Sequence, residues 1–296
     1  MTPVVVLTIA GSDSSGGAGL QADLKTFAAH RVHGASAVTA VTAQNTTAVT
    51  GVVALEPAFV VAQIDAVLAD LPVAGVKTGM LATSEIVAAI AAMAAAGRLP
   101  NLTVDPVLVS STGHLLTDEG GVTAFRELLL PCAEVATPNL REAAVLTGRP
   151  VSELATVEAM IDAAEEIRAL GATTVVVKGG HLAAAQAARV PGPDGRDRRA
   201  AGPASPDVIA GPDGVVVLEG GRVATANDHG TGCSLSAAIA AGLALGDGHI
   251  AAIRAAKDYV AAALAGAAGW HLGSGHGPID HFGWSADRSG PGAARP

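Results

Sequence analysis

Short runs rich in β-branched residues alternate along this chain with longer segments whose apolar residues recur at helical spacing. The runs predict strands at Val4–Ala10, Ala35–Gln44, Gly75–Thr78, Leu102–Asp105, Glu134–Thr137 and Thr173–Lys178. The longer segments predict helices at Pro57–Asp70 and Ser84–Ala96, where apolar residues return every three or four positions. Strands that alternate with helices indicate βαβ units. We therefore expect a single α/β domain whose mostly parallel central sheet carries helices on both faces.

The second half of the chain adds a hairpin and two helices to this pattern. The tetrapeptide "GPDG" lies between the apolar runs Val208–Ala210 and Val215–Leu218, and it is typical of a hairpin turn. Two closing helices are expected at about Gly232–Leu245 and His249–Ala268.

Two segments carry almost nothing that a core could bury. Residues 184–206 are rich in Pro, Gly and Arg, and we expect a mobile loop inserted between two strands. Residues 285–296 have a similar composition and are expected to form a disordered tail. The folded domain is therefore predicted to cover residues 1–284.

Composition excludes several classes of protein. The net charge of −9 and the aromatic content of 2% argue against nucleic-acid binding, which needs basic surface and stacking rings. Cys132 and Cys233 lie far apart without C-x-x-C spacing, so neither a zinc site nor a disulfide framework is indicated. No basic leader precedes the first apolar run, and the alanine-rich stretches are too short to span a bilayer. We expect a cytoplasmic protein without a membrane partner.

The loop "IAGSDSSGGAGLQADLKT" (9–26) places several glycines where the backbone turns sharply or approaches a ligand. Its "GAGLQA" matches a dinucleotide-binding pattern, but Gly19 comes nine positions after Ala10, too far for the tight turn of that motif. The second predicted strand ends in Gln44 and Asn45, without the acidic residue that binds ribose. A Walker-type phosphate loop is absent from the sequence. A glycine-rich turn without a ligand stays open as an alternative.

Short segments that contain polar residues follow almost every predicted strand. They are Gly11 and Asp13, Gln44 and Asn45, "KTGM" (77–80), "DPV" (105–107), "TPNLRE" (137–142) and "KGGH" (178–181). In an open parallel sheet, ligands bind beyond the carboxyl ends of the strands. We therefore expect these residues to form one site.

The motif "HGTGC" (229–233) opens a helix of small residues, where free N–H groups and the helix dipole favour an anion. Close helix packing is the alternative explanation for its glycines. Asp105, Thr137 and Glu142 could orient a hydrated Mg²⁺ against phosphates, and Lys178 could place a positive charge beside a triphosphate. Alternatively, Glu142 is a solvated helix-cap acid and Asp105 is an N-cap. The set suits phosphoryl transfer, which depends on positioning and charge neutralisation.

At this point the sequence resembles a known family. The segments that carry the resemblance are "AGSDSSGGAGLQADLKTF", "TAVTAQNT", "KTGML", "DPVLV", "TPNLREA", "VKGGH", "HGTGCSLSAAIAA" and "GHGPIDHF". In order from residue 9 to 282, they are similar to those of the hydroxymethylpyrimidine/phosphomethylpyrimidine kinases of thiamine biosynthesis, in the ribokinase-like superfamily. The resemblance implies a ribokinase-like fold and a homodimer. It also implies MgATP-dependent phosphorylation of the pyrimidine's hydroxymethyl group and then of the monophosphate.

The resemblance also implies a substrate pocket. Gln44 would recognise the aminopyrimidine edge, because its amide donates and accepts hydrogen bonds at once. Gly11 and Asp23 would line the same pocket, and Met80 would form an apolar wall, unless it is ordinary core.

The nucleotide side is implied in the same way. Asp105, Thr137 and Glu142 match the metal-orienting positions of related pyridoxal kinases, and Asn139 begins the N-x-x-E of the superfamily. Residues 230–232 would form the anion hole. The implied nucleotide ligands are Lys178, Asn139, Thr231 and Gly232, and the implied catalytic residues are Cys233, Gly230, Gly232 and Lys178.

Cys233 stands where the wider superfamily usually has an aspartate base. A thiol at a helix N-terminus can have a lowered pKa, so Cys233 is a candidate base for the first phosphorylation. Alternatively, it is a small residue that leaves room for the acceptor phosphate. Two other functions stay open: a pyridoxal kinase, and a non-catalytic pyrimidine-binding protein. The polar loop "VSSTGHLLT" (109–117) and the long 184–206 segment depart from the pattern of the family.

Overall fold

The computed structural model describes residues 2–108, 117–118, 120–180, 206–221, 223 and 225–287. The strands are β1 Val5–Ser12, β2 His33–Gln44, β3 Val49–Ala54, β4 Val73–Thr78, β5 Leu102–Val104, β6 Val135–Ala136, β7 Thr174–Lys178, β8 Asp207–Gly211 and β9 Gly214–Leu218. The helices are α1 Gly19–Ala29, α2 Pro57–Asp70, α3 Ser84–Ala95, α4 Gly121–Ala124, α5 Leu140–Thr147, α6 Val157–Arg168, α7 Thr231–Ala244, α8 His249–Ala267 and α9 Trp284–Asp287.

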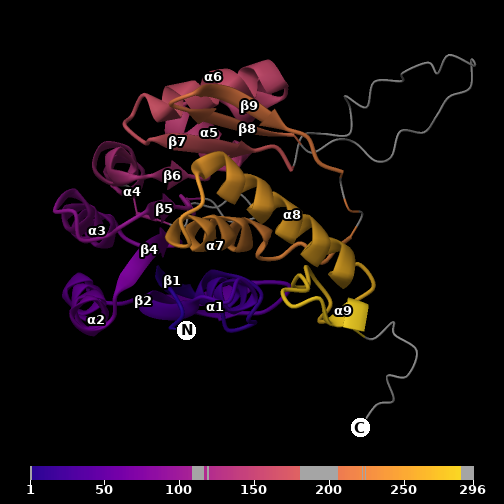
Figure 1. Ribbon diagram of the computed structural model, residues 1–296, viewed down its shortest axis with the longest axis horizontal. Coiled ribbons are helices and arrows are strands. Elements are labelled where there is room, and N and C mark those ends of the chain that lie inside the picture. Colours follow the sequence, from indigo (N-terminus) through magenta and orange to yellow (C-terminus); the bar gives the residue numbers. More distant parts are fainter. Residues whose placement is uncertain are drawn as a thin grey trace, which may run out of the picture.

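The described strands form one nine-stranded sheet in the order β3-β2-β1-β4-β5-β6-β7-β8-β9. The six strands from β2 to β7 in this order run parallel, and β3, β8 and β9 add antiparallel edges. Figure 1 shows α7 and α8 on one side of the sheet and α2, α3 and α4 on the other. This arrangement confirms the predicted α/β class, the mostly parallel sheet and its two helical layers.

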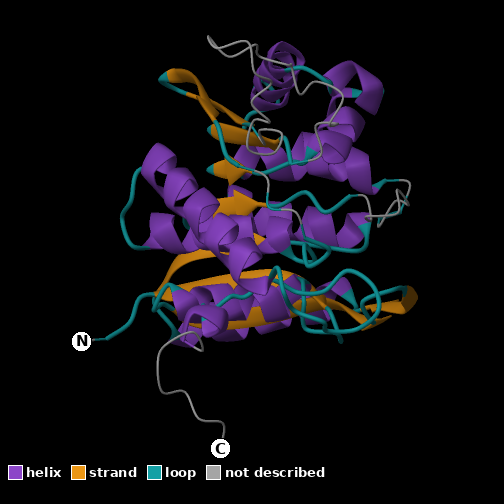
Figure 2. Ribbon diagram, turned by 90° about the vertical axis from the view of Figure 1, so that its right-hand side faces the viewer, coloured by secondary structure: helices purple, strands orange, loops and turns teal. Residues whose placement is uncertain are grey.

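Strand β7 shows how the sequence buries both faces of the sheet. Val175 and Val177 belong to the core cluster beneath α2, α3 and α6, whereas Val176 belongs to the cluster beneath α7 and α8. Successive side chains of a strand point to opposite faces, so an uninterrupted valine run fills two cores at once. Figure 2 shows the helices lying across the strands, and the lowest strands reaching beyond them at one side.

The predicted strands and helices recur with small changes at their ends. Helix α3 ends at Ala95, and Gly97 follows it with φ of 71°. The hairpin is confirmed, with Gly211 paired to Gly214. Strand β3 was not predicted. All of its residues are exposed, so no apolar alternation marks it, although its valines and threonine are a strand-forming composition.

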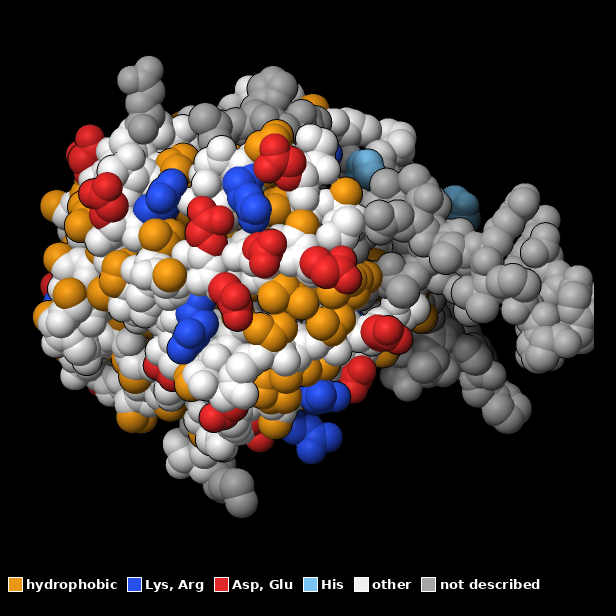
Figure 3. All heavy atoms as spheres, turned by 90° about the horizontal axis from the view of Figure 1, so that it is seen from above, with side chains coloured by type: hydrophobic (Ala, Val, Ile, Leu, Met, Phe, Trp, Pro, Cys, Tyr) orange, Lys and Arg blue, Asp and Glu red, His pale blue; other side chains and the backbone are white. Residues whose placement is uncertain are grey.

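Parts of the predicted loose segments lie outside the described residues. The 184–206 insertion does so up to residue 205, and so does most of the 109–117 loop. Residues 285–287 of the predicted tail belong to α9, and the remainder lies outside the described ranges. Within the described ranges, no helix is both long and apolar enough to cross a membrane. Cys132 and Cys233 are both free. Acidic and basic side chains are interspersed on the face shown in Figure 3.

Candidate active site

Asp13 organises the glycine-rich loop that follows β1. Its carboxylate accepts hydrogen bonds from the backbone N–H groups of Ser15 and Ala18, both at 2.8 Å, and of Gly17 at 3.2 Å. It also pairs with His229 Nε2 at 2.8 Å. Burial alone would raise the pKa of Asp13, but these partners, with His229 foremost, hold it below its ordinary value. Asp13 therefore stays ionised and ties this loop to the turn before α7.

The two glycine-rich turns lie in direct contact. Gly230 has φ of 85°, and a Cβ there would overlap the carbonyl oxygen of Gly17. A Cβ on Gly17 would in turn overlap the ring of His229. Only glycine combines this backbone angle with such a close approach. The structure therefore brings the opening loop to the predicted anion hole.

Gln44 ends β2 beside these turns. Its backbone N–H donates to Ser14 Oγ, and Ser14 Oγ donates to its carbonyl, each at 2.8 Å. Its side-chain Nε2 lies 3.3 Å from His229 Nε2. Because His229 Nε2–H is directed at the Asp13 carboxylate, that nitrogen has no lone pair left for the Gln44 amide. The Nε2 group of Gln44 is therefore available to a ligand, and its Oε1, which accepts from Thr42 Oγ1 at 3.2 Å, keeps a second lone pair.

Gly11 and Met80 lie together as predicted. A Cβ on Gly11 would stand 2.6 Å from Met80 Cε, so the methionine side chain covers the end of β1. Met80 is half-buried, and Thr39 Oγ1 holds its backbone carbonyl at 2.6 Å. This arrangement fits an apolar wall beside Gln44.

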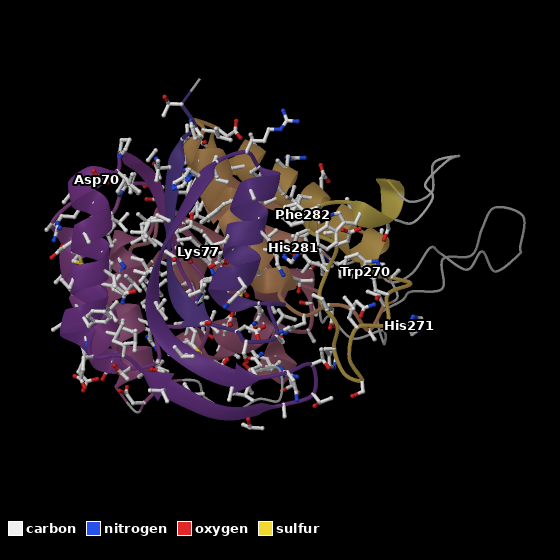
Figure 4. The ribbon with its side chains drawn as sticks, turned by 90° about the horizontal axis from the view of Figure 1, so that it is seen from below. Asp70, Lys77, Trp270, His271, His281 and Phe282 are labelled. Carbon is white, nitrogen blue, oxygen red and sulfur yellow. The ribbon has the colours of Figure 1, made fainter. Side chains whose placement is uncertain are left out.

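Asp23 differs from its predicted position on the pocket surface. Its side chain is fully buried, and both carboxylate oxygens lie 2.9 Å from Lys77 Nζ. Thr8 Oγ1 also donates to Asp23 at 2.6 Å. Burial alone would lower the pKa of Lys77, but the Asp23 carboxylate raises it above its ordinary value. Figure 4 shows Lys77 in the interior of the molecule. Asp23 is thus buried beneath the site, paired with Lys77, and does not line the pocket surface.

Asp105, after β5, joins three elements. Its Oδ1 accepts from Lys178 Nζ at 3.1 Å and Thr137 Oγ1 at 3.2 Å, and its Oδ2 accepts from Ser236 Oγ at 3.2 Å. Burial alone would raise the pKa of Asp105, but the ammonium groups of Lys178 and Lys77 hold it below the ordinary value. Lys178 Nζ also lies 3.3 Å from the position of a Cβ on Gly232. The predicted acid, hydroxyl and cation therefore meet beside the anion hole.

Glu142 and Asn139 form a capping box at the start of α5. Asn139 Oδ1 accepts from the N–H groups of Arg141 and Glu142, and Glu142 Oε2 accepts from the N–H of Asn139 at 2.8 Å. The capping alternative for Glu142 is therefore confirmed, although its side chain is buried and not solvated. Burial raises the pKa of Glu142 to about 8, against the opposing effect of Lys178.

Asp105, Thr137 and Glu142 are the residues that the resemblance implies for a magnesium ion. No three His, Cys, Asp or Glu side chains form a metal cluster among the described residues. Asp105 and Glu142 nevertheless offer carboxylate oxygens beside Thr137, and Mg²⁺ commonly takes one or two carboxylates together with phosphates and water. The residues fit a metal shared with a nucleotide.

Cys233 lies in the first turn of α7, near the Lys77–Asp23 pair. Burial raises the pKa of its thiol to about 11, although the Lys77 ammonium opposes the rise. This direction is opposite to the lowering expected at a helix N-terminus, because burial disfavours the charged thiolate.

No individual role was predicted for three residues that contact the site: His229, Lys77 and Ser236. His229 directly precedes the glycine pair, and Lys77 begins "KTGM", so both motifs contained a signal. Ser236 had no signal beyond its place one turn into α7.

Comparisons with known proteins show the family of this chain. The model of the family described as phosphomethylpyrimidine kinase matches residues 13–280. A hydroxymethylpyrimidine/phosphomethylpyrimidine kinase of Rhizobium meliloti is 47% identical over 279 residues, which cover 94% of this chain and 97% of the relative. The pyridoxal kinase of Bacillus subtilis in its ADP complex superposes with a TM-score of 0.81 at 35% identity, over 96% of this chain and 100% of that one. The phosphomethylpyrimidine kinase of Clostridium difficile has a TM-score of 0.70 at 37% identity, over 87% and 97%.

Proposed function

The chain belongs to the phosphomethylpyrimidine kinase family, and from this premise we propose the reaction that it performs. It transfers a phosphoryl group from ATP to 4-amino-5-hydroxymethyl-2-methylpyrimidine, and then a second one to the monophosphate, in thiamine diphosphate synthesis. One arrangement carries the proposal: the turn at residues 229–232 adjoins both Gln44 and Lys178. Gln44 Nε2 lies 3.3 Å from His229 Nε2, and Lys178 Nζ lies 3.3 Å from the Cβ position of Gly232. This supports a proposed pyrimidine-binding group and a proposed phosphate-binding group on two sides of one turn.

The pyrimidine binds beside Gln44. A ring nitrogen next to an exocyclic amine needs one donor and one acceptor, which a single amide supplies. Gly11 lets the ring approach the end of β1, and Met80 packs against it. Asp13 holds the His229 ring, so the pocket is organised before substrate arrives.

The nucleotide phosphates bind at the start of α7. The N–H groups of residues 230–232 and the helix dipole face the transferring phosphate. Lys178 adds a positive charge there, and Asn139 and Thr231 are further contacts. Asp105, Thr137 and Glu142 would hold Mg²⁺, which neutralises phosphate charge when bound.

The two phosphorylations place different demands on Cys233. The first acceptor is an alcohol, and Cys233 is the proposed base that removes its proton. The second acceptor is a phosphate that is already ionised at neutral pH, so it needs no base. Because the thiol is protonated at neutral pH, proton removal should limit the first step, unless Cys233 serves only to leave space.

The proposed active form is a homodimer in the cytoplasm. Apolar side chains are exposed along the β3 edge and on α2; they are Val41, Val49, Val52, Val53 and Phe59. A second copy that covers this surface would remove it from water. Sedimentation at micromolar concentration tests the assembly, and a purely monomeric species would contradict it.

The decisive experiment offers hydroxymethylpyrimidine, its monophosphate and pyridoxal to the purified protein with MgATP, and resolves the products by mass. Conversion of the pyrimidine through mono- to diphosphate is expected. Turnover of pyridoxal alone would favour the second candidate, which the likeness to a pyridoxal kinase structure supports. Binding without turnover would leave only a pyrimidine-binding protein.

A further inference from the structure

Residues 270–278, hereafter the C-terminal segment, follow α8 and lead back to the active site. They contain no group assigned above to substrate, nucleotide or metal. Figure 4 shows Trp270 and His271 on this gold segment, at the side of the molecule where the β2–β3 strand pair ends. Its "GHGP" (275–278) begins the last motif of the sequence, "GHGPIDHF", for which the reaction has no role so far.

One end of the C-terminal segment holds the turn between β2 and β3. The His276 N–H donates to the Thr46 carbonyl at 2.9 Å, and the Gly275 N–H donates to Thr46 Oγ1 at 3.2 Å. A Cβ on Gly273 or Gly275 would overlap Thr46. The absence of these two side chains therefore allows the backbone to lie directly on Thr46.

The held turn is itself rigid. Asn45 Oδ1 accepts from the N–H groups of Thr47 at 2.9 Å and Ala48 at 3.0 Å. Such an Asx turn restricts the backbone on both sides of Thr46. Displacement of Thr46 would consequently move Gln44, which lies two residues earlier.

The same segment also holds the turn that leads into the candidate anion hole. The His229 N–H donates to the Gly277 carbonyl at 3.0 Å. Asn227, which is only 6% exposed, donates through Nδ2 to the carbonyls of Ala267 at 2.7 Å and Trp270 at 3.0 Å. Gly277 leaves room for the Asn227 side chain, which a Cβ would overlap.

We propose that the C-terminal segment is a positioning element for phosphoryl transfer. It sets the separation between Gln44, which binds the pyrimidine, and residues 230–232, which bind the transferring phosphate. The inference rests on the proposed function, because only a reaction that joins these two sites needs their separation to be constant. A misplacement of about 1 Å between reacting groups can reduce a rate by roughly 100-fold.

The chain offers a matched pair of variants six residues apart. In Gly275→Ala the new methyl group must displace the Thr46 backbone, and no positive φ adds strain at this position. In Gly269→Ala the same methyl group meets nothing within 4 Å. Thr46→Val is a third variant, which removes the acceptor of the Gly275 N–H and keeps the side-chain shape.

We expect Gly275→Ala to raise the KM for the pyrimidine and to lower kcat, with kcat/KM reduced roughly tenfold or more. The KM for ATP should stay within about twofold, because Lys178 and Asn139 do not contact the segment. Thr46→Val should change the same parameters in the same direction, and Gly269→Ala should match the parent. Loss of folded protein alone would lower kcat and leave both KM values unchanged.

Hydrogen exchange supplies a readout that is independent of activity. The amides of residues 45–48, His229 and His276 should exchange faster in Gly275→Ala than in Gly269→Ala. Wild-type turnover with identical kinetics in these two variants would overturn the inference. Absence of turnover in the parent would refute the proposed function instead. In that case hydrogen exchange alone tests whether the C-terminal segment holds the two turns. Equal exchange rates in Gly275→Ala and Gly269→Ala would overturn this inference.

Discussion

Replacement of Lys77 tests how the active site is supported from beneath. Lys77 and Asp23 are both fully buried, with 2.9 Å between Nζ and each carboxylate oxygen. Lys77→Met preserves much of the side-chain volume but leaves a buried carboxylate with Thr8 as its remaining donor. Loss of one partner of a buried pair costs about 3–5 kcal/mol. Because domains are stable by only about 5–15 kcal/mol, this single change should bring the protein close to unfolding.

Removal of the second charge should restore much of that loss. In the double variant Asp23→Asn, Lys77→Met neither charge of this pair remains, so the two changes should be non-additive by about 2 kcal/mol. The exposed pair Arg98–Asp65, at 2.7 Å, provides the control. Arg98→Met should cost less than about 1 kcal/mol, because water screens both charges.

Urea unfolding followed by circular dichroism at pH 7 measures the free energy of unfolding of each variant. A loss below about 1 kcal/mol in Lys77→Met, or additive single changes, would refute the argument. Steady-state kinetics of Asp23→Asn adds a separate check. A large rise in the KM for the pyrimidine without loss of stability would place Asp23 on the pocket surface after all.

Three further predictions concern Cys233, His281 and Asp105. Burial raises the pKa of Cys233 to about 11, so the fraction of thiolate grows between pH 7 and 10. If Cys233 is the base, kcat for the hydroxymethyl substrate should therefore rise over this range in stopped-time assays. The slope should vanish in Cys233→Ala, persist in Cys132→Ala, and be absent for the monophosphate. Burial lowers the pKa of His281 from 6.5 to about 4, so the unfolded chain takes up the proton first as the solution is acidified. The free energy of unfolding should therefore fall between pH 6.5 and 4, by at most about 3 kcal/mol, and His281→Gln should flatten this fall in urea titrations. Asp105→Asn should raise the Mg²⁺ concentration for half-maximal rate, measured by coupled ADP release, and an unchanged value would remove Asp105 from the metal site.

Local sequence patterns were sufficient to predict much of the secondary structure and the fold class of this protein. The valine runs of strands such as β7 and the apolar spacing of α2 and α3 depend on neighbours a few residues away, so the sheet and its two helical layers were predictable. The turn residues were predictable for the same reason. Gly97 ends α3 and Asn139 caps α5, because backbone angle and capping are properties of adjacent residues. The order of polar residues at strand ends likewise predicted one site for Gln44, Asp105 and Lys178, and the structure pairs Lys178 with Asp105.

Only the tertiary structure decided which of these groups face a ligand and how they ionise. Asp23 pairs with a lysine 54 positions away, and Asp13 pairs with a histidine 216 positions away. No local pattern specifies such partners. The raised pKa of Cys233 comes mainly from burial by the surrounding elements, which no local pattern around residue 233 specifies. The contact of residues 273–277 with Thr46 is decided in the same way, because packing sets the distances between segments that are remote in the chain.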